Sequence, residues 1–369
     1  MPAPAITLEV LPAGYGDCLL VQCPVGKRTW RLLVDTGPDE TYPALKARLA
    51  ALPLDSLGQR YIDLFIVTHI DHDHIGAASL LLNDRTLGLS FGDIWFNAPP
   101  RPTPRGVAEG QSLAELLGAM GTTLPWNKAF GGKTVVSTGE SGAVELTTPV
   151  GQPKITLLSP NASRLADLYR VWDRELARLR SGETDKAERA LPLTVPADAI
   201  DVKALAAKRT PVDHAVANGS SIAILLEHRG ASVVLGADAF ASVMVPALHS
   251  LAAKRKRSLP MKVDAIKLSH HGSRGNVTND LLAAIQAEHY LFSTNNAIFN
   301  HPDDESVARV LVNGGKQPTL WFNYATMRNL RWASSQAAAE FTYKARYPEA
   351  PGQGVQIELT ARRIRRPRQ

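Results

Sequence analysis

Features that would place a protein in a specialised class are scarce in this sequence. Its 369 residues include only two cysteines, and aromatic residues make up 6% of the chain. No apolar run approaches the ~18 residues that a membrane-spanning helix needs. The first residues also lack the basic start and apolar core of a signal peptide. These absences argue against a disulfide-stapled or membrane-spanning chain, and we expect a cytoplasmic protein.

The two cysteines are expected to be buried and reduced. Cys18 and Cys23 are five positions apart in what reads as one hairpin. An odd spacing on a regular strand places two side chains on opposite faces, where they cannot form a bridge. The pair also lacks the spacing of a zinc knuckle.

The most informative segment is Thr-His-Ile-Asp-His-Asp-His-Ile-Gly at residues 68–76. It follows residues 61–67, an apolar run typical of a buried strand, and it precedes a helix-compatible stretch. We therefore expect its side chains on a loop that a rigid scaffold presents to a cleft. Imidazole and carboxylate groups are the usual ligands of zinc and similar metals. The segment predicts a metal site, and a solvated polar loop is the less favoured alternative.

Polar side chains follow several other expected strands. Expected strands cover residues 29–34, 231–235, 263–268 and 288–293. The side chains that follow them are Asp35, Asp238, the pair His270 and His271, and His301. Strand ends that deliver such groups to one edge of a sheet are typical of an active-site rim.

Taken in order, these motifs resemble those of the metallo-β-lactamase fold superfamily. Its motif His-x-His-x-Asp-His is matched by His69-x-Asp71-x-Asp73-His74, with Asp in place of the second His. This variant is similar to the hydrolase domain of the DNA-uptake channel proteins called ComEC and to related stand-alone enzymes. The resemblance covers roughly residues 5 to 312. Its other motifs are Gly16-Asp17-Cys18, Leu33-Val34-Asp35-Thr36-Gly37, Leu235-Gly236-Ala237-Asp238, Ser269-His270-His271-Gly272-Ser273 and Asn300-His301-Pro302.

The resemblance implies an α/β protein with the metallo-β-lactamase-type αββα four-layer sandwich, as a single domain over residues 1–369. The pattern changes over residues 97–210, and we expect an inserted helical and loop region there, with a strand at residues 134–137 and an exposed or mobile connector at residues 181–208. That region would wall or cover the cleft, and an insertion with a purely structural role is the alternative. A basic tail occupies residues 362–369.

The resemblance also implies two divalent metal ions in neighbouring sites, and a single metal ion is the alternative. The implied ligands are His69 and Asp71 for the first ion, Asp73, His74 and His271 for the second, and Asp238 as a bridge between them. Because carboxylates are numerous in this set, manganese or iron is compatible with it, although zinc is the default.

Four further residues have implied or candidate roles at this site. Asp35 is expected to orient the ligands through hydrogen bonds. His270 is an alternative ligand or a substrate contact. The third ligand that the superfamily usually supplies to the first ion has no clear match, and Asp213 and His214 are the nearest candidates.

The chemistry expected of this site is hydrolysis by a metal-activated water. Asp73 would hold the second ion and orient that water, and no Ser or Cys triad is evident. His301 is a candidate general acid for the leaving group. A structural turn before Pro302 is an equally compatible interpretation of that segment.

We predict a metal-dependent phosphoesterase that acts on a small-molecule or nucleic-acid phosphodiester and has no membrane partner. A hydrolase of a small ester, lactam or lactone is the first alternative, and a non-catalytic metal-binding module is the second. The net charge is +6, with basic clusters at residues 254–257 and 362–368. Such clusters can contact phosphate backbones, although a basic tail is often only a solvated end.

Overall fold

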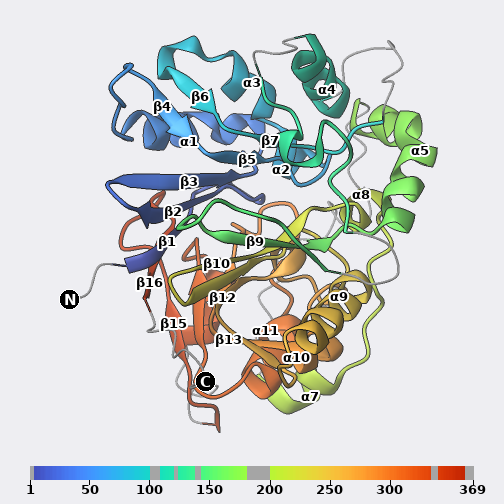
Figure 1. Cartoon of the computed structure of the whole chain (residues 1–369). Helices are drawn as coiled ribbons and strands as arrows, with labels where there is room; N and C mark the ends of the chain where they lie inside the picture. Colours follow the sequence, from blue (N-terminus) through green and yellow to red (C-terminus); the bar gives the residue numbers. More distant parts are fainter. Residues whose placement is uncertain are drawn as a thin grey trace.

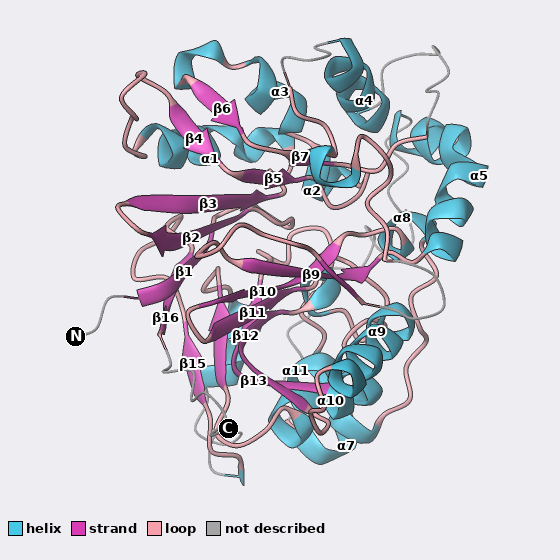
Figure 2. Cartoon of the chain, viewed as in Figure 1, coloured by secondary structure: helices cyan, strands magenta, loops and turns pink. Residues whose placement is uncertain are grey.

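The computed structural model describes residues 4–99, 109–119, 124–137, 143–180, 200–333 and 340–361. Over these ranges the chain forms two β-sheets that face each other, with helices on both outer sides (Figure 1). The same view coloured by secondary structure shows the strands sandwiched between helical layers (Figure 2). The predicted αββα sandwich is therefore confirmed. None of the described helices is long and apolar enough to cross a bilayer.

The first sheet is built mainly from the N-terminal part of the chain. Its described strands run in the order β16-β1-β2-β3-β5-β7. Their bounds are β1 (Pro4–Val10), β2 (Leu19–Val25), β3 (Arg28–Val34), β5 (Leu64–Ile66), β7 (Ile94–Trp95) and β16 (Val355–Thr360). The last strand returns from the end of the described chain to pair with β1 in antiparallel register. A separate small sheet pairs β4 (Arg60–Ile62) with β6 (Leu89–Phe91).

The second sheet has the order β15-β14-β13-β12-β11-β10-β9-β8 among the described residues. The bounds are β8 (Val144–Glu145), β9 (Lys154–Ser159), β10 (Ala223–His228), β11 (Ala231–Leu235), β12 (Met261–Lys267), β13 (Ile285–Phe292), β14 (Thr319–Phe322) and β15 (Lys344–Arg346). Neighbours from β11 to β15 are parallel. Since β8 and β9 come from residues 97–210, part of that region is an edge of the main sandwich.

Each outer face carries its own helical layer. The first sheet is covered by α1 (Tyr42–Ala50), α3 (Ala78–Asn83), α4 (Glu109–Ala119) and α5 (Ala162–Arg180). The second sheet is covered by α7 (Val202–Ala207), α9 (Ala241–Lys254), α10 (Asn279–Ala284) and α11 (Asp304–Asn313). The described residues also form three short helices, α2 (His72–Ile75), α8 (Val216–Gly219) and α12 (Met327–Leu330). In Figure 1 the two layers lie above and below the sheets.

The strand residues alternate between two cores, as a buried sheet requires. In β10, Leu225 packs against the outer helices, whereas Ile224 and Leu226 pack between the sheets. The cysteines follow the same rule. Cys18 joins the core under the first helical layer and Cys23 joins the core between the sheets, and both are buried free thiols. The prediction of buried, reduced cysteines on opposite faces is confirmed.

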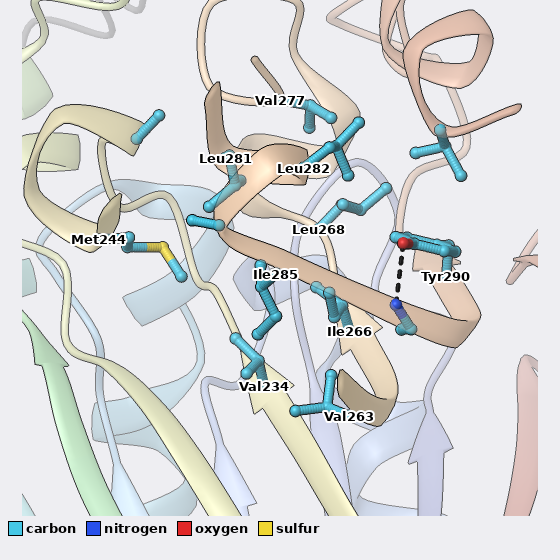
Figure 3. Packing of buried hydrophobic residues seen from close by; sticks show 14 of the residues in the cluster. Val234, Met244, Val263, Ile266, Leu268, Val277, Leu281, Leu282, Ile285 and Tyr290 are labelled. Atoms are coloured by element: carbon cyan, nitrogen blue, oxygen red, sulfur yellow. Dashed lines mark hydrogen bonds between the residues drawn. The ribbon is translucent and has the colours of Figure 1, made fainter. Parts of the chain in front are cut away.

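The outer core of the second sheet is seen from close by in Figure 3. Met244 of α9 lies over strand residues such as Val234 and Ile266. The buried hydroxyl of Tyr290 accepts a hydrogen bond of 2.9 Å from the backbone N–H of Ala287. Apolar packing with a satisfied polar group makes this layer a rigid support for the loops at the strand ends.

Two local predictions were wrong because polar side chains replace backbone partners. Residues 61–67 form two strands in different sheets, with the break at Asp63, whose carboxylate accepts the backbone N–H of Arg31 at 2.9 Å. Residues 134–137 form only a bridge at Ser137. There the side chain of Asn97 bonds both the N–H and the C=O of Val135, each at 2.8 Å, and so takes the place of a strand.

The segment from residue 181 to 208 was predicted to be an exposed connector. Residues 181–199 lie outside the described ranges. From residue 202 onward the prediction was wrong, since the Asp201 side chain accepts the backbone N–H of Ala204 and caps helix α7. Val202 and Ala206 then bury themselves in the outer core. A good N-cap and two apolar positions on one face account for this helix.

Candidate metal centre

Loops at the carboxyl ends of strands bring the candidate residues together. Asp35 follows β3, and the motif at residues 69–74 follows β5. Asp238 follows β11, and the His270–His271 pair follows β12. The motif is partly helical and not wholly a loop as predicted, because α2 begins at His72. The side chain of His72 turns outward to Asp39 and Glu40, which are exposed.

Several residues at these strand ends have a left-handed backbone. The φ angles are 57° at Asp35, 44° at Ala237, 50° at His270 and 54° at His271. Non-glycine residues in this region cost about 1 kcal/mol or more each, so the surrounding structure must enforce them. Such strained positions concentrate at functional sites, and here they aim side chains at one point.

That point is the buried carboxylate of Asp238. Four imidazole Nε2 atoms surround it: those of His74 at 3.3 Å, His270 at 3.8 Å, and His69 and His271 at 3.9 Å each. Direct hydrogen bonds are shorter than most of these separations. The spacing suits ligands arranged around a cation rather than bonded to each other.

Two overlapping groups of donors lie within this arrangement. His69, His74 and Asp238 form one, and Asp73, His74 and His271 form the other. In the second group, the Asp73 Oδ2 atom lies 3.0 Å from His271 Nε2 and 3.6 Å from His74 Nε2. Asp71 lies at the edge of the first group, where its carboxylate is 3.5 Å from His69 Nε2.

The other ring nitrogen of each of these histidines faces a partner that fixes the tautomer. His74 Nδ1 lies 2.8 Å from an Asp35 carboxylate oxygen, and His271 Nδ1 donates to the carbonyl of Ser293 at 2.8 Å. His69 Nδ1 donates to the Thr68 hydroxyl, which itself donates to Asp35. A proton on Nδ1 leaves the Nε2 lone pair available for a metal. Asp35 therefore contacts His74 directly and His69 through Thr68, and its role in orienting metal ligands stays a prediction.

Buried atoms without partners support this interpretation. His69 Nε2, His74 Nε2 and Asp238 Oδ1 are buried and make no hydrogen bond within the described part of the chain. Buried polar atoms are nearly always paired. Three such atoms that converge on one point fit divalent metal ligation, so the residues present are suited to the ions that the motif implies.

A buried ion pair behind His271 was not recognised from the sequence. The Lys267 ammonium contacts Asp17, and the Asp17 carboxylate lies 3.3 Å from His271 Nδ1. Burial alone would raise the pKa of Asp17, but Lys267 and His271 hold it below its usual value. The available signal was the Gly16-Asp17 motif itself, which places a carboxylate at a turn opposite the expected end of β12.

The two candidates for the third ligand of the first ion, Asp213 and His214, lie outside the donor groups around Asp238. His214 is exposed and lines a pocket of about 340 Å³ with Arg164 and Phe240. Asp213 contacts His270, with its Oδ2 atom 3.2 Å from His270 Nδ1. Neither residue belongs to the donor groups found among the described residues.

The carboxylates give the centre a negative electrostatic potential, which favours protonated imidazoles or bound cations. Burial disfavours a charged His74, yet Asp238, Asp73 and Asp35 raise the pKa of its imidazole well above the usual value. Burial likewise opposes protonation of His270, but Asp238 and Asp213 raise its pKa to about 10. Burial would raise the pKa of Asp73, whereas His74 and His271 lower it to about 2. Without a metal, protons on the imidazoles balance the carboxylates.

Metal binding at neutral pH should therefore release protons. The nearby carboxylates favour the protonated form of His74 and of His270 in the metal-free protein, so an ion that binds either imidazole must displace its proton. Metal affinity should therefore rise with pH, and the rise should continue until the pH exceeds the raised pKa of His270, about 10. Calorimetric titration of metal-free protein with zinc, in buffers of different ionisation enthalpy, measures the release. Heats independent of buffer and affinity independent of pH would contradict the assignment.

His301 lies beside this centre. Its ring is 5.0 Å from that of His270, and its Nδ1 lies 3.4 Å from the Asp303 carboxylate. Phe299 stacks on the His301 ring with centroids 5.8 Å apart and also lies 6.5 Å from the His270 ring. Burial would raise the pKa of Asp303, but His301 lowers it to about 2, so the carboxylate stays ionised beside the imidazole.

Residues 11–88 match the family model described as the Metallo-beta-lactamase superfamily. The matched segment contains Asp35 and the whole His69–His74 motif. This match supports assignment to the metallo-β-lactamase superfamily. No curated protein is similar enough to match the chain.

Solved structures with a similar fold share little sequence with this chain. The metallo-beta-lactamase fold protein YhfI from Bacillus subtilis is 12% identical, with a TM-score of 0.43, over 96% of this chain and 99% of its own. Zn(2+)-bound PqqB from Methylobacterium extorquens is 12% identical, with a TM-score of 0.43, over 96% and 100%. The metallo hydrolase Igni18 from Ignicoccus hospitalis is 14% identical, with a TM-score of 0.41, over 96% and 100%.

Proposed function

We propose that this protein is a metal-dependent hydrolase and that its substrate is a phosphoester. The observation that carries the proposal is the convergence of four imidazole Nε2 atoms on the Asp238 carboxylate, with Asp73 beside them. His69 and Asp71 would hold one divalent ion, Asp73, His74 and His271 a second, and Asp238 would bridge the two. Zinc is the default choice for this set, and manganese or iron suits its carboxylates.

When bound, the ions supply Lewis acidity and lower the pKa of a water that attacks the substrate. The residues of the chain keep the imidazoles in the required tautomer, through Asp35 for His74 and through Ser293 for His271. The buried position of Asp73 and Asp238 keeps bulk water from competing for the ligand atoms. No side-chain nucleophile is needed.

His301 is suited to deliver a proton to the leaving oxygen. Neither of its ring nitrogens makes a hydrogen bond inside the described ranges, and only 7% of the residue is exposed. The ionised Asp303 carboxylate lies 3.4 Å from Nδ1 and can orient the ring. A phosphoester with a poor leaving group needs such a donor more than an activated ester does.

Turnover assays with added zinc or manganese test the function. Hydrolysis of bis(p-nitrophenyl) phosphate is the expected result. Hydrolysis of nitrocefin or a simple ester without phosphodiesterase activity would favour the alternative hydrolase of a small ester, lactam or lactone. Bound metal without either activity would favour a non-catalytic metal-binding module.

The basic cluster at residues 254–257 offers little to a nucleic-acid substrate. Lys254 pairs with Glu145 at 2.9 Å, and Arg255 pairs with Glu145 and Glu227 at 2.8 Å each. These residues close the 14-residue helix α9, which starts just after Asp238 and spans about 20 Å. The cluster is thus partly neutralised and far from the metal centre.

The basic tail, residues 362–369, lies outside the described ranges and stays a prediction. If the substrate is a nucleic acid, removal of the tail after Ala361 should weaken DNA or RNA binding and flatten its salt dependence. Each lost phosphate contact removes about one unit of slope. Hydrolysis of bis(p-nitrophenyl) phosphate should be unchanged, because it needs only the metal centre. Equal affinity and slope in both proteins would mean that the tail is a solvated end, and no binding at low salt would favour a small-molecule phosphodiester.

A further inference from the structure

We propose that His270 is the third ligand of the first metal site and that Asp213 is the positioning residue for its ring. The inference rests on the proposed metal centre and concerns how this chain completes it. His69 and Asp71, with the bridging Asp238, give the first ion a single imidazole and leave its third non-bridging ligand unassigned. His270 Nε2 lies 3.8 Å from the Asp238 Oδ2 atom, on which His69 Nε2 also converges at 3.9 Å.

The position of His270 around Asp238 matches that of its neighbours. Its Nε2 is as far from the carboxylate as the Nε2 atoms of His69 and His271. Its backbone has φ 50° and ψ 52°, in the left-handed region, directly before the similar φ of His271. Two consecutive non-glycine residues in this conformation are costly. This backbone geometry turns both imidazoles toward the same carboxylate, which supports a shared role for the two rings.

A hydrogen-bond network holds the Nδ1 edge of the His270 ring, which faces away from Asp238. Nδ1 lies 3.2 Å from Asp213 Oδ2 and 3.1 Å from Asn276 Oδ1. The amide groups of Asn218 and Asn276 donate to the same Asp213 oxygen at 2.8 and 3.1 Å, and the Asn276 amide also reaches the backbone carbonyl of Asp238 at 3.1 Å. The Asn218 amide nitrogen also lies 3.3 Å from Nδ1, but the two acceptors are nearer and one of them is charged, which favours a proton on Nδ1. The lone pair is therefore on Nε2, toward the metal centre.

This arrangement gives Asp213 the relation to His270 that Asp35 has to His74. In each pair a carboxylate from a separate loop fixes Nδ1–H at about hydrogen-bond distance and leaves Nε2 directed at Asp238. Asp213, which the sequence offered as a candidate metal ligand, thus acts on the metal site indirectly, by positioning the His270 ring. His214, its exposed neighbour, has no such role.

Asp213→Asn is the informative variant, because it separates loop structure from ring positioning. The Asp213 Oδ1 atom accepts the backbone N–H of Ala215 at 2.8 Å, and the amide oxygen of asparagine can keep that bond. The new NH₂ group would then face His270 Nδ1 and the amides of Asn218 and Asn276, all of which require an acceptor. The ring would lose its fixed tautomer while the turn persists.

The experiment measures zinc content and affinity by chelator competition, together with the visible spectrum of the cobalt(II)-loaded protein. Wild type should bind two ions. His270→Ala should lose one ion, or bind it at least about a hundred-fold more weakly, and keep the other. Asp213→Asn should weaken one site by about 10- to 100-fold, the effect typical of a lost orienting carboxylate, and change the cobalt spectrum. His214→Ala is the matched control and should behave as wild type.

Two outcomes overturn the inference and are distinguishable. If His270→Ala and Asp213→Asn both bind two ions with wild-type affinity and spectrum, His270 is not a ligand, while the proposed hydrolase is untouched. If wild type binds no metal, the proposed function fails first. A cooperative thermal unfolding transition in each metal-free variant shows that any loss of metal is not a failure to fold. A changed cobalt spectrum in Asp213→Asn is a result that a purely structural Asp213 would not produce.

Discussion

Asp73→Ala is expected to abolish hydrolysis while leaving the fold intact. The Asp73 carboxylate lies between His74 and His271, so its loss reduces the second group of ligands to two imidazoles and the shared Asp238. Several kcal/mol of transition-state stabilisation depend on a bound ion, which corresponds to a rate loss of at least about a hundred-fold. Steady-state turnover of bis(p-nitrophenyl) phosphate with saturating metal measures the loss.

A matched control is available on the same loop system. Asp39 is exposed and pairs with His72, outside the converging set, so Asp39→Ala should retain turnover and metal content. Unfolding of metal-free Asp73→Ala should resemble that of wild type, because the apolar cores lie elsewhere. If Asp73→Ala keeps more than about a tenth of wild-type turnover, which is roughly 1.4 kcal/mol of barrier, Asp73 does not hold a metal in the reaction.

The sequence predicted the sandwich and most of the site because both depend on local patterns. Strand alternation and ordered motifs identified Asp35, Asp238 and the His69–His74 segment as groups at strand ends. In the structure these groups meet at one edge, since the ends of β3, β5, β11 and β12 point the same way. The prediction that Cys18 and Cys23 face opposite sides of a sheet holds for the same reason.

What the sequence did not predict depends on contacts between distant segments. Asp213 reaches His270 across 57 positions of sequence, and the Lys267–Asp17 pair spans 250. Single-sequence patterns carry no distance information for such pairs. The same limit applies to Asn97, whose side chain replaces a strand partner for Val135, and to the break at Asp63. In each case one polar side chain overrides the local propensity of an apolar run.

The backbone at Gly16 lies very close to the backbone of Asp73 in the His69–His74 motif. A Cβ atom at this position would lie 1.8 Å from the carbonyl oxygen of Asp73 and 2.7 Å from its carbonyl carbon. The next residue donates its backbone N–H to the same oxygen at 3.1 Å. These are backbone atoms on both sides, so no side chain can rotate to make room. Glycine is required at this position for proximity and not for a left-handed φ.

Gly16→Ala is therefore expected to damage both stability and the metal centre. Overpacking costs about 1–3 kcal/mol of stability when side chains can adjust. Two opposed backbone segments can adjust less, so the cost at Gly16 should lie at or above the upper end of this range. The midpoint of thermal unfolding should fall by several degrees, and displacement of Asp73 should lower turnover at least about ten-fold. Gly118→Ala is the control, because nothing lies within 4 Å of a Cβ there and alanine favours the helix by about 1 kcal/mol. Wild-type stability and turnover in Gly16→Ala would show that the Gly16 and Asp73 loops are not held together as the structure describes.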